Sequence, residues 1–276
     1  MKPAAFDYTR AESVAHAVAL LQDGKGGARI LAGGQSLGPM LNLRLARPAR
    51  LIDVKRVAAL RALAADACVL RVGAAWTHAE IEDGAVEDAS GMLRHVARGI
   101  AYRAVRNRGT LGGSLAHADP AADWVAAMAA LGAAVVMQGP VGERRVPADG
   151  FVLGAFATAL GEADVLTAIE LPRLPADARW GFCKICRKSG EYAQAIGAAV
   201  LDTAHGLARV LCGATGGAPV LLAATAARLA QAGPQAAQAA AAEEIASRLA
   251  HVDAIGGQLL TVAARRALRQ LETARP

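Results

Sequence analysis

Two short segments with paired glycines next to hydroxyl residues have the types and spacing that could do chemistry. The first is Ala-Gly-Gly-Gln-Ser at residues 32–36, and the second is Thr-Leu-Gly-Gly-Ser at residues 110–114. Glycine has no Cβ to block an approaching anion, so backbone N–H groups can turn toward a phosphate. Two such loops, far apart in the chain, are typical of a site that binds one long ligand from two sides. They predict that the chain binds a dinucleotide through its pyrophosphate.

The common nucleotide-binding motifs are absent from the sequence. No G-x-G-x-x-G stands between a strand and a helix, and Gly24-Lys25-Gly26-Gly27 does not supply a Walker P-loop. An isolated Gly-Gly pair is also compatible with an ordinary turn. Ser36 and Ser114 weaken that alternative because their hydroxyls can also donate to phosphate.

A C-x-x-C motif at Cys183 and Cys186 raises redox or metal chemistry as an alternative. The surrounding residues are typical of a strand, where side chains three positions apart face opposite sides of the sheet. No second cysteine or histidine pair lies nearby in the sequence to complete a metal site. We expect a structural role for both thiols and no metal.

The elements that must position these loops follow from hydrophobic spacing and capping residues. Thr9 and Glu12 predict a capping box that opens a helix through about Gln22, and Thr77 and Glu80 predict a second one. Asp119-Pro120 is typical of a helix start and predicts a helix carrying Trp124, Val125, Met128 and Leu131. Further elements are expected as strands at 29–32, 51–54, 69–75, 135–137 and 165–171 and a helix at 92–100.

Two close prolines, Pro172 and Pro175, predict a domain boundary. Beyond them we expect three strands at 180–187, 195–202 and 207–214, and alanine- and leucine-rich helices at about 220–231, 236–251 and 256–272. The sequence shows no internal repeat.

Composition excludes several classes of protein. The 276 residues are 54% hydrophobic but only 4% aromatic, which predicts a core of Ala, Val, Leu and Ile. The net charge is +6, yet the arginines are scattered and hardly interleaved with aromatics, so we expect no nucleic-acid binding. The amino terminus lacks an apolar signal core and the longest apolar run, residues 125–137, is too short for a transmembrane segment. These features predict a cytoplasmic protein.

Three segments together resemble the FAD-binding (medium) subunits of the molybdenum hydroxylase family, to which carbon monoxide dehydrogenase and xanthine dehydrogenase belong. Residues 31–40 are similar to the family's A-G-G-[HTQ]-[SD]-L signature. Residues 110–123 resemble its T-[IL]-G-G-[NS]-x-x-x-x-[DS]-P-x-x-D signature, and residues 184–193 its K-x-x-R-[KR]-x-[GD]-[DE]-[YI]-A segment. The resemblance follows the whole chain in order.

The resemblance implies an α+β fold of two domains. Residues 1–174 would form a two-subdomain FAD-binding domain of the vanillyl-alcohol-oxidase (PCMH) type, divided at about 1–55 and 56–174. Residues 175–276 would form a small α+β domain with a three-stranded antiparallel sheet and helices, of the CO dehydrogenase flavoprotein type.

The resemblance also implies the residues that bind FAD. The two loops would hold the pyrophosphate through backbone N–H groups and serines, Asp123 would accept hydrogen bonds from the ribose, and Lys184 would lie near the polar edge of the flavin ring. Tyr192 would shield the flavin face, and no residue is assigned a catalytic role of its own. The implied cofactor-binding residues are Leu31, Ala32, Gly33, Gly34, Gln35, Ser36, Leu37, Thr110, Gly112, Gly113, Ser114, Asp123, Leu166, Lys184 and Tyr192.

Some of these residues have plainer interpretations from the sequence. Asp123 could be a first-turn acid favoured by the helix dipole, Tyr192 a packed sheet residue and Leu166 a core residue. We expect His117 to be loop scaffolding and not a catalytic base, because the sequence shows no carboxylate partner for it.

The implied function is electron transfer within a complex. Molybdopterin would reside in a large partner subunit and two [2Fe–2S] clusters in a small one, in a dimer of heterotrimers. Electrons would pass through FAD in this chain to an external acceptor. Two other functions stay open at this point: a self-contained flavin oxidase or dehydrogenase with its own small substrate, and a non-catalytic nucleotide- or anion-binding regulatory module.

Departures from the family signatures refine these expectations. Gln35 stands where several relatives carry His or Thr, and because glutamine cannot attach a flavin covalently we expect dissociable FAD. Ser114 replaces a frequent Asn, and Glu191 a frequent Asp. The sequence has no cysteine-rich insertion, so we expect no additional iron–sulfur cluster in this chain.

Overall fold

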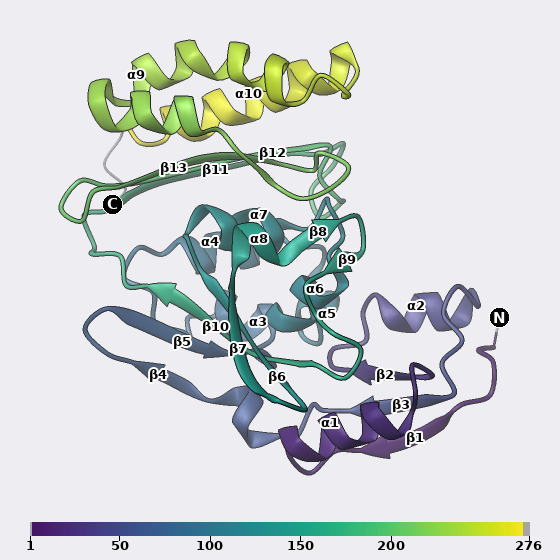
Figure 1. Cartoon of the computed structure of the whole chain (residues 1–276). Coiled ribbons are helices and arrows are strands. Elements are labelled where there is room, and N and C mark those ends of the chain that lie inside the picture. The colour runs from purple at the N-terminus through teal and green to yellow at the C-terminus, as the bar shows by residue number, and fades with distance from the viewer. Residues whose placement is uncertain (1, 273–276) are drawn as a thin grey trace.

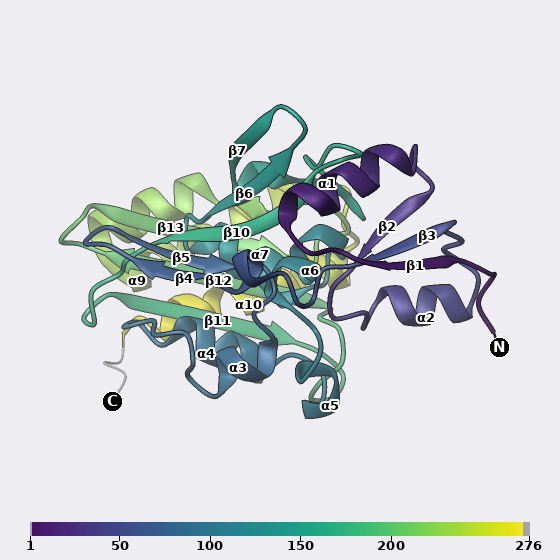
Figure 2. The ribbon, with the colours of Figure 1, turned by 90° about the horizontal axis from the view of Figure 1, so that it is seen from below.

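The computed structural model describes residues 2–272, which form three main sheets with their helices (Figure 1). The first sheet is parallel with strand order β1-β3-β2. Figure 2 shows its two helices on opposite faces. Its elements are β1 (Asp7–Arg10), α1 (Val14–Asp23), β2 (Ala28–Leu31), α2 (Leu37–Asn42) and β3 (Arg50–Asp53). The connection β2-α2-β3 therefore carries the first glycine loop at the carboxyl end of β2.

The second sheet is antiparallel with order β4-β5-β10-β6-β7. Most helices of this part are inserted between β5 and β6, and they carry the second glycine loop. The elements are η1 (Ala58–Arg61), β4 (Leu63–Ala65), β5 (Val69–Gly73), α3 (His78–Glu82), α4 (Met92–Arg98), α5 (Arg103–Arg106), α6 (Leu111–His117), α7 (Asp123–Ala130), β6 (Ala134–Gly139), β7 (Gly142–Pro147), α8 (Ala148–Phe151), the hairpin β8 (Val152–Gly154) and β9 (Ala157–Thr158), and β10 (Val165–Pro172).

The third sheet is antiparallel with order β11-β12-β13-β14. Two long helices cover the face that lies away from the rest of the chain (Figure 1). The elements are β11 (Arg179–Ile185), β12 (Ala195–Asp202), β13 (Leu207–Gly213), β14 (Val220–Leu221), α9 (Ala223–Arg248) and α10 (Ala254–Arg269). A Cβ on Gly197 would overlap the backbone of Ala263 in α10, so glycine and alanine let this helix lie directly on the sheet.

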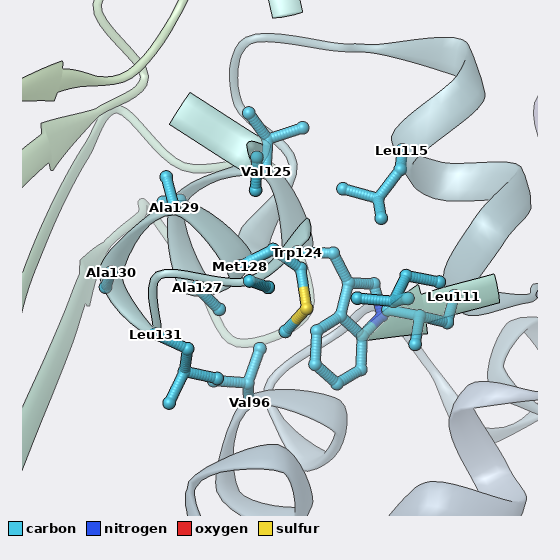
Figure 3. Close-up of a cluster of buried hydrophobic side chains, with 14 of the residues drawn as sticks. Val96, Leu111, Leu115, Trp124, Val125, Ala127, Met128, Ala129, Ala130 and Leu131 are labelled. Atoms are coloured by element: carbon cyan, nitrogen blue, oxygen red, sulfur yellow. The ribbon is translucent and has the colours of Figure 1, made fainter. Parts of the chain in front are cut away.

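Helix α7 is the centre of the main core. All eight of its residues are buried, and Figure 3 shows Trp124 and Met128 packed with Leu111, Leu115 and Val96. The same core continues into the third sheet through Trp180 and Phe182. Both faces of that sheet are covered, which explains why all eight residues of β12 are buried.

The expectations for the fold class and for several helices and strands are confirmed. The structure is of mixed α+β class, strands lie within a few residues of the expected ranges, and Thr77 and Glu80 form the predicted capping box. All four cysteines are free thiols. Among residues 2–272, no three His, Cys, Asp or Glu side chains are grouped so as to hold a metal. The helices of the same part of the chain include none with the length and apolar character needed to cross a membrane.

Two predicted helix starts are wrong. Thr9 lies in β1 and pairs with Ile52 of β3, so the first helix is capped by Ser13, whose side chain accepts from His16 N. Asp119 does not begin a helix because its side chain accepts from Ala121 N in a tight turn, and α7 starts four residues later at Asp123.

The carboxyl-terminal part also differs from the prediction. Its sheet has four strands instead of three, since the short β14 pairs with β13. The two helices expected at 220–231 and 236–251 are both present within α9, which consists of two helical parts. They meet at a kink where Gly233, with φ +79° and ψ −177°, is not helical and is followed by Pro234.

Candidate functional site

The first glycine loop offers free backbone donors. Gly34 has φ +71°, a backbone conformation that favours glycine and turns the chain from β2 toward α2. Within residues 2–272, the N–H groups of residues 33–36 have no hydrogen-bond acceptor, and the next donor that has one is Gly38 N, which bonds to Gly34 O at 2.9 Å. Successive unpaired N–H groups in a turn make an anion-binding concavity.

The second glycine loop is organised differently, because the N–H groups of residues 111–114 all donate within the chain. Leu111 N donates to Trp76 O at 3.0 Å, Gly112 N to Ala74 O at 2.9 Å, and Ser114 N to Thr110 O at 3.0 Å. Gly113 N donates to the Thr110 hydroxyl at 3.1 Å, which caps α6. The expectation that both loops supply free N–H groups therefore holds for the first loop alone, and Ser114 is left to contribute through its hydroxyl.

The two loops are in direct contact. A Cβ on Gly33 would overlap the carbonyl of Arg108 and stand 2.8 Å from the Cα of Gly109. A Cβ on Gly113 would stand 3.9 Å from the Cβ of Ala32. Gly33 thus allows the close approach of one loop to the other, whereas the contact at Gly113 has an ordinary van der Waals length. Close approach is a different role from the open space for phosphate that the sequence suggested.

Gln35 stabilises its own loop. Its Nε2 donates to the carbonyl of Gly33 at 3.2 Å. The side chain is therefore engaged with the backbone beside the free donors.

Asp123 of α7 and Lys184 of β11 form a buried ion pair. Lys184 Nζ lies 2.8 Å from Asp123 Oδ2, with side chains 12% and 6% exposed, and also donates to Gly99 O at 3.3 Å. The other carboxylate oxygen, Oδ1, is buried and has no hydrogen-bond partner among the described residues. Burial raises the pKa of the Asp123 carboxyl, and the Lys184 ammonium opposes that rise.

Tyr192 connects the segment after β11 with the first loop. The residue is 62% exposed, so it is not the packed sheet residue of the alternative interpretation. Partial burial and the negative charge of Asp119 raise the pKa of its phenol, and hydrogen bonding by the Ser36 hydroxyl opposes this. The third sheet thus contributes a side chain directly beside Ser36.

Leu166 and His117 have surroundings of a structural kind. Leu166 is 7% exposed in β10, paired with Met137, and belongs to the main core. The ring of His117 packs on Phe156, with ring centroids 5.1 Å apart. None of the hydrogen bonds of the described residues joins Leu166 or His117 to the first loop.

Sequence reasoning missed the residues that join the loops. Arg108 and Gly109 directly precede the second signature and form the surface on which Gly33 rests. Ala101, with φ +43°, touches the position where a Cβ on Gly190 would stand, at 3.1 Å from its carbonyl oxygen. The only signal in the sequence was the glycine at positions 33, 109 and 190. A contact between segments that are distant in the chain leaves no local pattern.

The residues present fit an FAD pyrophosphate and a polyol or ribose. The first loop supplies free donors for an anion, and the orphaned Oδ1 of Asp123 can accept from a hydroxyl group. Asp123 and Lys184 line a cavity of about 290 Å³ between α4 and β11. A larger cavity of about 630 Å³ lies between α1 and the second sheet, but none of the expected site residues lines it.

Comparison with protein families gives one match that covers most of the chain. Residues 4–174 match the family model described as the FAD binding domain in molybdopterin dehydrogenase.

Curated relatives are similar over about 70% of the chain. The chain is 39% identical over 194 residues to 6-hydroxypseudooxynicotine dehydrogenase complex subunit alpha of Paenarthrobacter nicotinovorans, covering 70% of this chain and 66% of that protein. It is 40% identical over 196 residues to the carbon monoxide dehydrogenase medium chain of Hydrogenophaga pseudoflava, covering 71% and 68%. The aligned region therefore spans about two thirds of these relatives.

Solved structures resemble the whole chain. The carbon monoxide dehydrogenase of Hydrogenophaga pseudoflava superposes with a TM-score of 0.89 at 33% identity, covering 99% of each chain. Quinoline 2-oxidoreductase of Pseudomonas putida 86 superposes with a TM-score of 0.87 at 34% identity, covering 98% of each chain.

Proposed function

We propose a function for this chain on the premise that it belongs to the FAD-binding medium subunits of the molybdenum hydroxylase family. We propose that it is the FAD-binding, electron-transferring subunit of a molybdopterin-containing hydroxylase or dehydrogenase. The observation that carries this proposal is the first loop, whose residues 33–36 present free N–H groups beside the second loop.

The proposed FAD site combines three parts of the chain. Residues 33–36 bind the pyrophosphate through N–H groups, and the hydroxyls of Ser36 and Ser114 add donors. Asp123 accepts from a ribose or polyol hydroxyl through Oδ1, while Lys184 neutralises Oδ2. Tyr192 lies beside Ser36 and covers the flavin. Leu166 shapes the site from the core of the second sheet and makes no polar contact with FAD.

FAD supplies the redox chemistry, because a flavin takes up two electrons and releases them singly or in pairs. The chain's own residues bind the cofactor and limit access to it. The relatives are subunits of dehydrogenase complexes. We propose that a small subunit with [2Fe–2S] clusters and a large molybdopterin subunit complete this complex, as a dimer of heterotrimers, and that FAD here passes electrons to an external acceptor.

We also propose that the chain consists of two domains. Residues 1–174 form the FAD-binding domain, with subdomains around the first and second sheets, and residues 175–276 form the domain of the third sheet. The family match at residues 4–174 supports this division. We also propose a cytoplasmic location, in keeping with four free thiols, which are typical of reducing compartments.

The experiment that tests this function is a titration of the purified full chain with FAD, followed by flavin fluorescence. ADP serves as a competitor, because it shares the pyrophosphate and the adenosine. We expect saturable FAD binding that ADP displaces. Absence of binding by the chain, alone and with co-expressed partner subunits, would contradict the proposal.

Two glycine variants provide a matched control. Gly34→Ala should weaken FAD binding, because φ +71° is strained for alanine and the loop must change its conformation. Gly38→Ala should leave binding unchanged, since a Cβ there meets no atom within 4 Å. Turnover of a small alcohol or aldehyde by the isolated chain would instead favour a self-contained flavin enzyme.

A further inference from the structure

His78 is a buried histidine that the proposed function does not use. It opens α3 and is 5% exposed. Its Nδ1 lies 3.0 Å from Nε1 of Trp124, which donates to it because an indole nitrogen can only donate. The neutral imidazole therefore carries its proton on Nε2, and its orientation is fixed by Trp124 in the core of α7.

The opposite edge of the imidazole covers Gly109. Nε2 and Cδ2 lie 2.8 and 2.9 Å from the point where a Cβ on Gly109 would stand. The backbone N–H of His78 donates to Gly109 O at 2.9 Å, and the neighbouring Thr77 and Thr110 form an antiparallel bridge. The start of α3 and the start of the second loop are therefore held together by both backbone and side chain.

Gly109 meets the first loop on its other side. A Cβ on Gly33 would stand 2.8 Å from Gly109 Cα. Trp124, His78, Gly109 and Gly33 therefore form a continuous series of contacts, from the residue next to Asp123 to the beginning of the free N–H groups. A change of size or orientation at His78 would be transmitted to the first loop through atoms already in contact.

We propose that His78 is a positioning residue of the cofactor site, whose Trp124-bound imidazole sets how closely residues 33–36 approach the second loop. The effect on FAD rests on the function proposed above, whereas the effect on the loops does not. Besides burial, the charge of Arg106 lowers the pKa of the His78 ring. Burial and the Arg106 charge lower the pKa of His78 from 6.5 to about 4, so the ring stays neutral and able to accept from Trp124 near pH 7.

A double-mutant cycle in the full chain tests this contact. Gly109→Ala places a methyl group against the imidazole, and His78→Ala removes the ring. We expect Gly109→Ala to weaken FAD affinity about 10-fold in the wild-type background and less than about 2-fold in the His78→Ala background, the non-additivity typical of residues in contact. An equal effect in both backgrounds would overturn the proposal, because a general loss of stability predicts additivity.

Hydrogen–deuterium exchange gives a second readout that needs no FAD. The hydrogen-bonded amides beside the contact are those of Gly38, which donates to Gly34 O, and of Leu111, which donates to Trp76 O. Both should exchange faster in Gly109→Ala and His78→Ala than in the wild type, while those of β12 should not change. If His78→Ala does not fold, His78→Asn takes its place, since it keeps an acceptor for Trp124 but lacks Nε2. Unchanged exchange at Gly38 and Leu111 would overturn the role of His78. If the wild-type chain does not bind FAD at all, the proposed function is overturned instead.

Discussion

Gly33 is important for a reason that the sequence showed only in part. The sequence suggested that glycine there leaves room for a phosphate. The structure places the backbone of Arg108 and Gly109 where a side chain would stand. The glycine allows the contact between the two loops, and the free N–H groups of residues 33–36 lie beside it.

Gly33→Val should therefore abolish FAD binding by separating the loops. A β-branched side chain would meet backbone atoms that cannot rotate away, so we expect an affinity loss of at least about 100-fold, or roughly 3 kcal/mol. FAD titration of the folded variant measures it. Flavin content equal to that of the wild type would show that the loops can move apart without consequence.

The pair of Asp123 and Lys184 was expected as two separate cofactor contacts, and the structure joins them. Lys184→Met should lower the free energy of unfolding by about 3 kcal/mol, because it leaves a buried carboxyl without its partner. Chemical denaturation measures this difference. Lys188→Met is the matched control: Lys188 pairs with Glu191 at 3.4 Å but is 69% exposed, so its loss should cost less than about 1 kcal/mol. Equal effects of the two variants would contradict a structural role for the buried pair.

His78 predicts a pH dependence of stability. Its pKa is about 4 in the folded chain and 6.5 when unperturbed, so the unfolded state binds more protons between these values. The contribution of neutral His78 is complete above pH 6.5 and is lost as the pH falls toward 4, by about 3 kcal/mol in total. Denaturation between pH 7 and 4.5 should show this slope in the wild type and a smaller slope in His78→Asn. Identical slopes would argue against titration of His78.

At the scale of elements, the sequence predicted strands and buried helices well because their apolar spacing is local. The prediction was wrong where a contact with a distant segment determines the secondary structure. Thr9 has a good capping-box pattern, but pairing with β3 places it in a strand. Asp119 has a good helix-start pattern, but a turn stabilised by its own side chain takes its place. The two-residue β14 exists only because β13 lies beside it.

The same limit applies to the site. The signatures predicted a site made of both glycine loops, Asp123, Lys184 and Tyr192, and that site stays a prediction. They did not reveal that the second loop's donors are occupied, because the carbonyls of Ala74 and Trp76 that accept from it come from a separate segment. Hydrogen-bond saturation depends on tertiary pairing and cannot be read from a local motif.

The segment after β11 places Tyr192 beside Ser36 of the first loop, where we propose that it covers the flavin. Tyr192→Ala should raise the rate at which oxygen reoxidises reduced flavin several-fold, since an exposed ring beside Ser36 is removed. Stopped-flow absorbance of the FAD-loaded chain measures the rate. Tyr192→Phe keeps the ring and should remain close to the wild type. An unaltered rate in Tyr192→Ala would contradict shielding by this element.

At the scale of the whole molecule, α7 packs against the third sheet, and Asp123 of α7 pairs with Lys184 of that sheet (Figure 1). Large apolar side chains also remain at the surface, among them Leu45, Leu153 and Phe156, which are 72%, 66% and 61% exposed. Leu153 and Phe156 belong to the same hairpin, β8–β9, and we propose that this exposed apolar hairpin contacts another subunit.

The chain expressed alone should therefore self-associate at high concentration, whereas co-expression with its partner subunits should give a single defined species. Size-exclusion chromatography with light scattering distinguishes the two states. A stable monomer at high concentration, with no binding to the partner subunits, would contradict a place in a complex.

The most direct test of the central claim is the visible spectrum of the purified chain before and after addition of FAD, with denaturation to release the cofactor. We predict the two absorption bands of a protein-bound oxidised flavin, near ~370 and ~450 nm, and complete release of FAD on denaturation, because Gln35 offers no covalent attachment. A chain that stays colourless with FAD, both alone and with its partner subunits, would contradict the account.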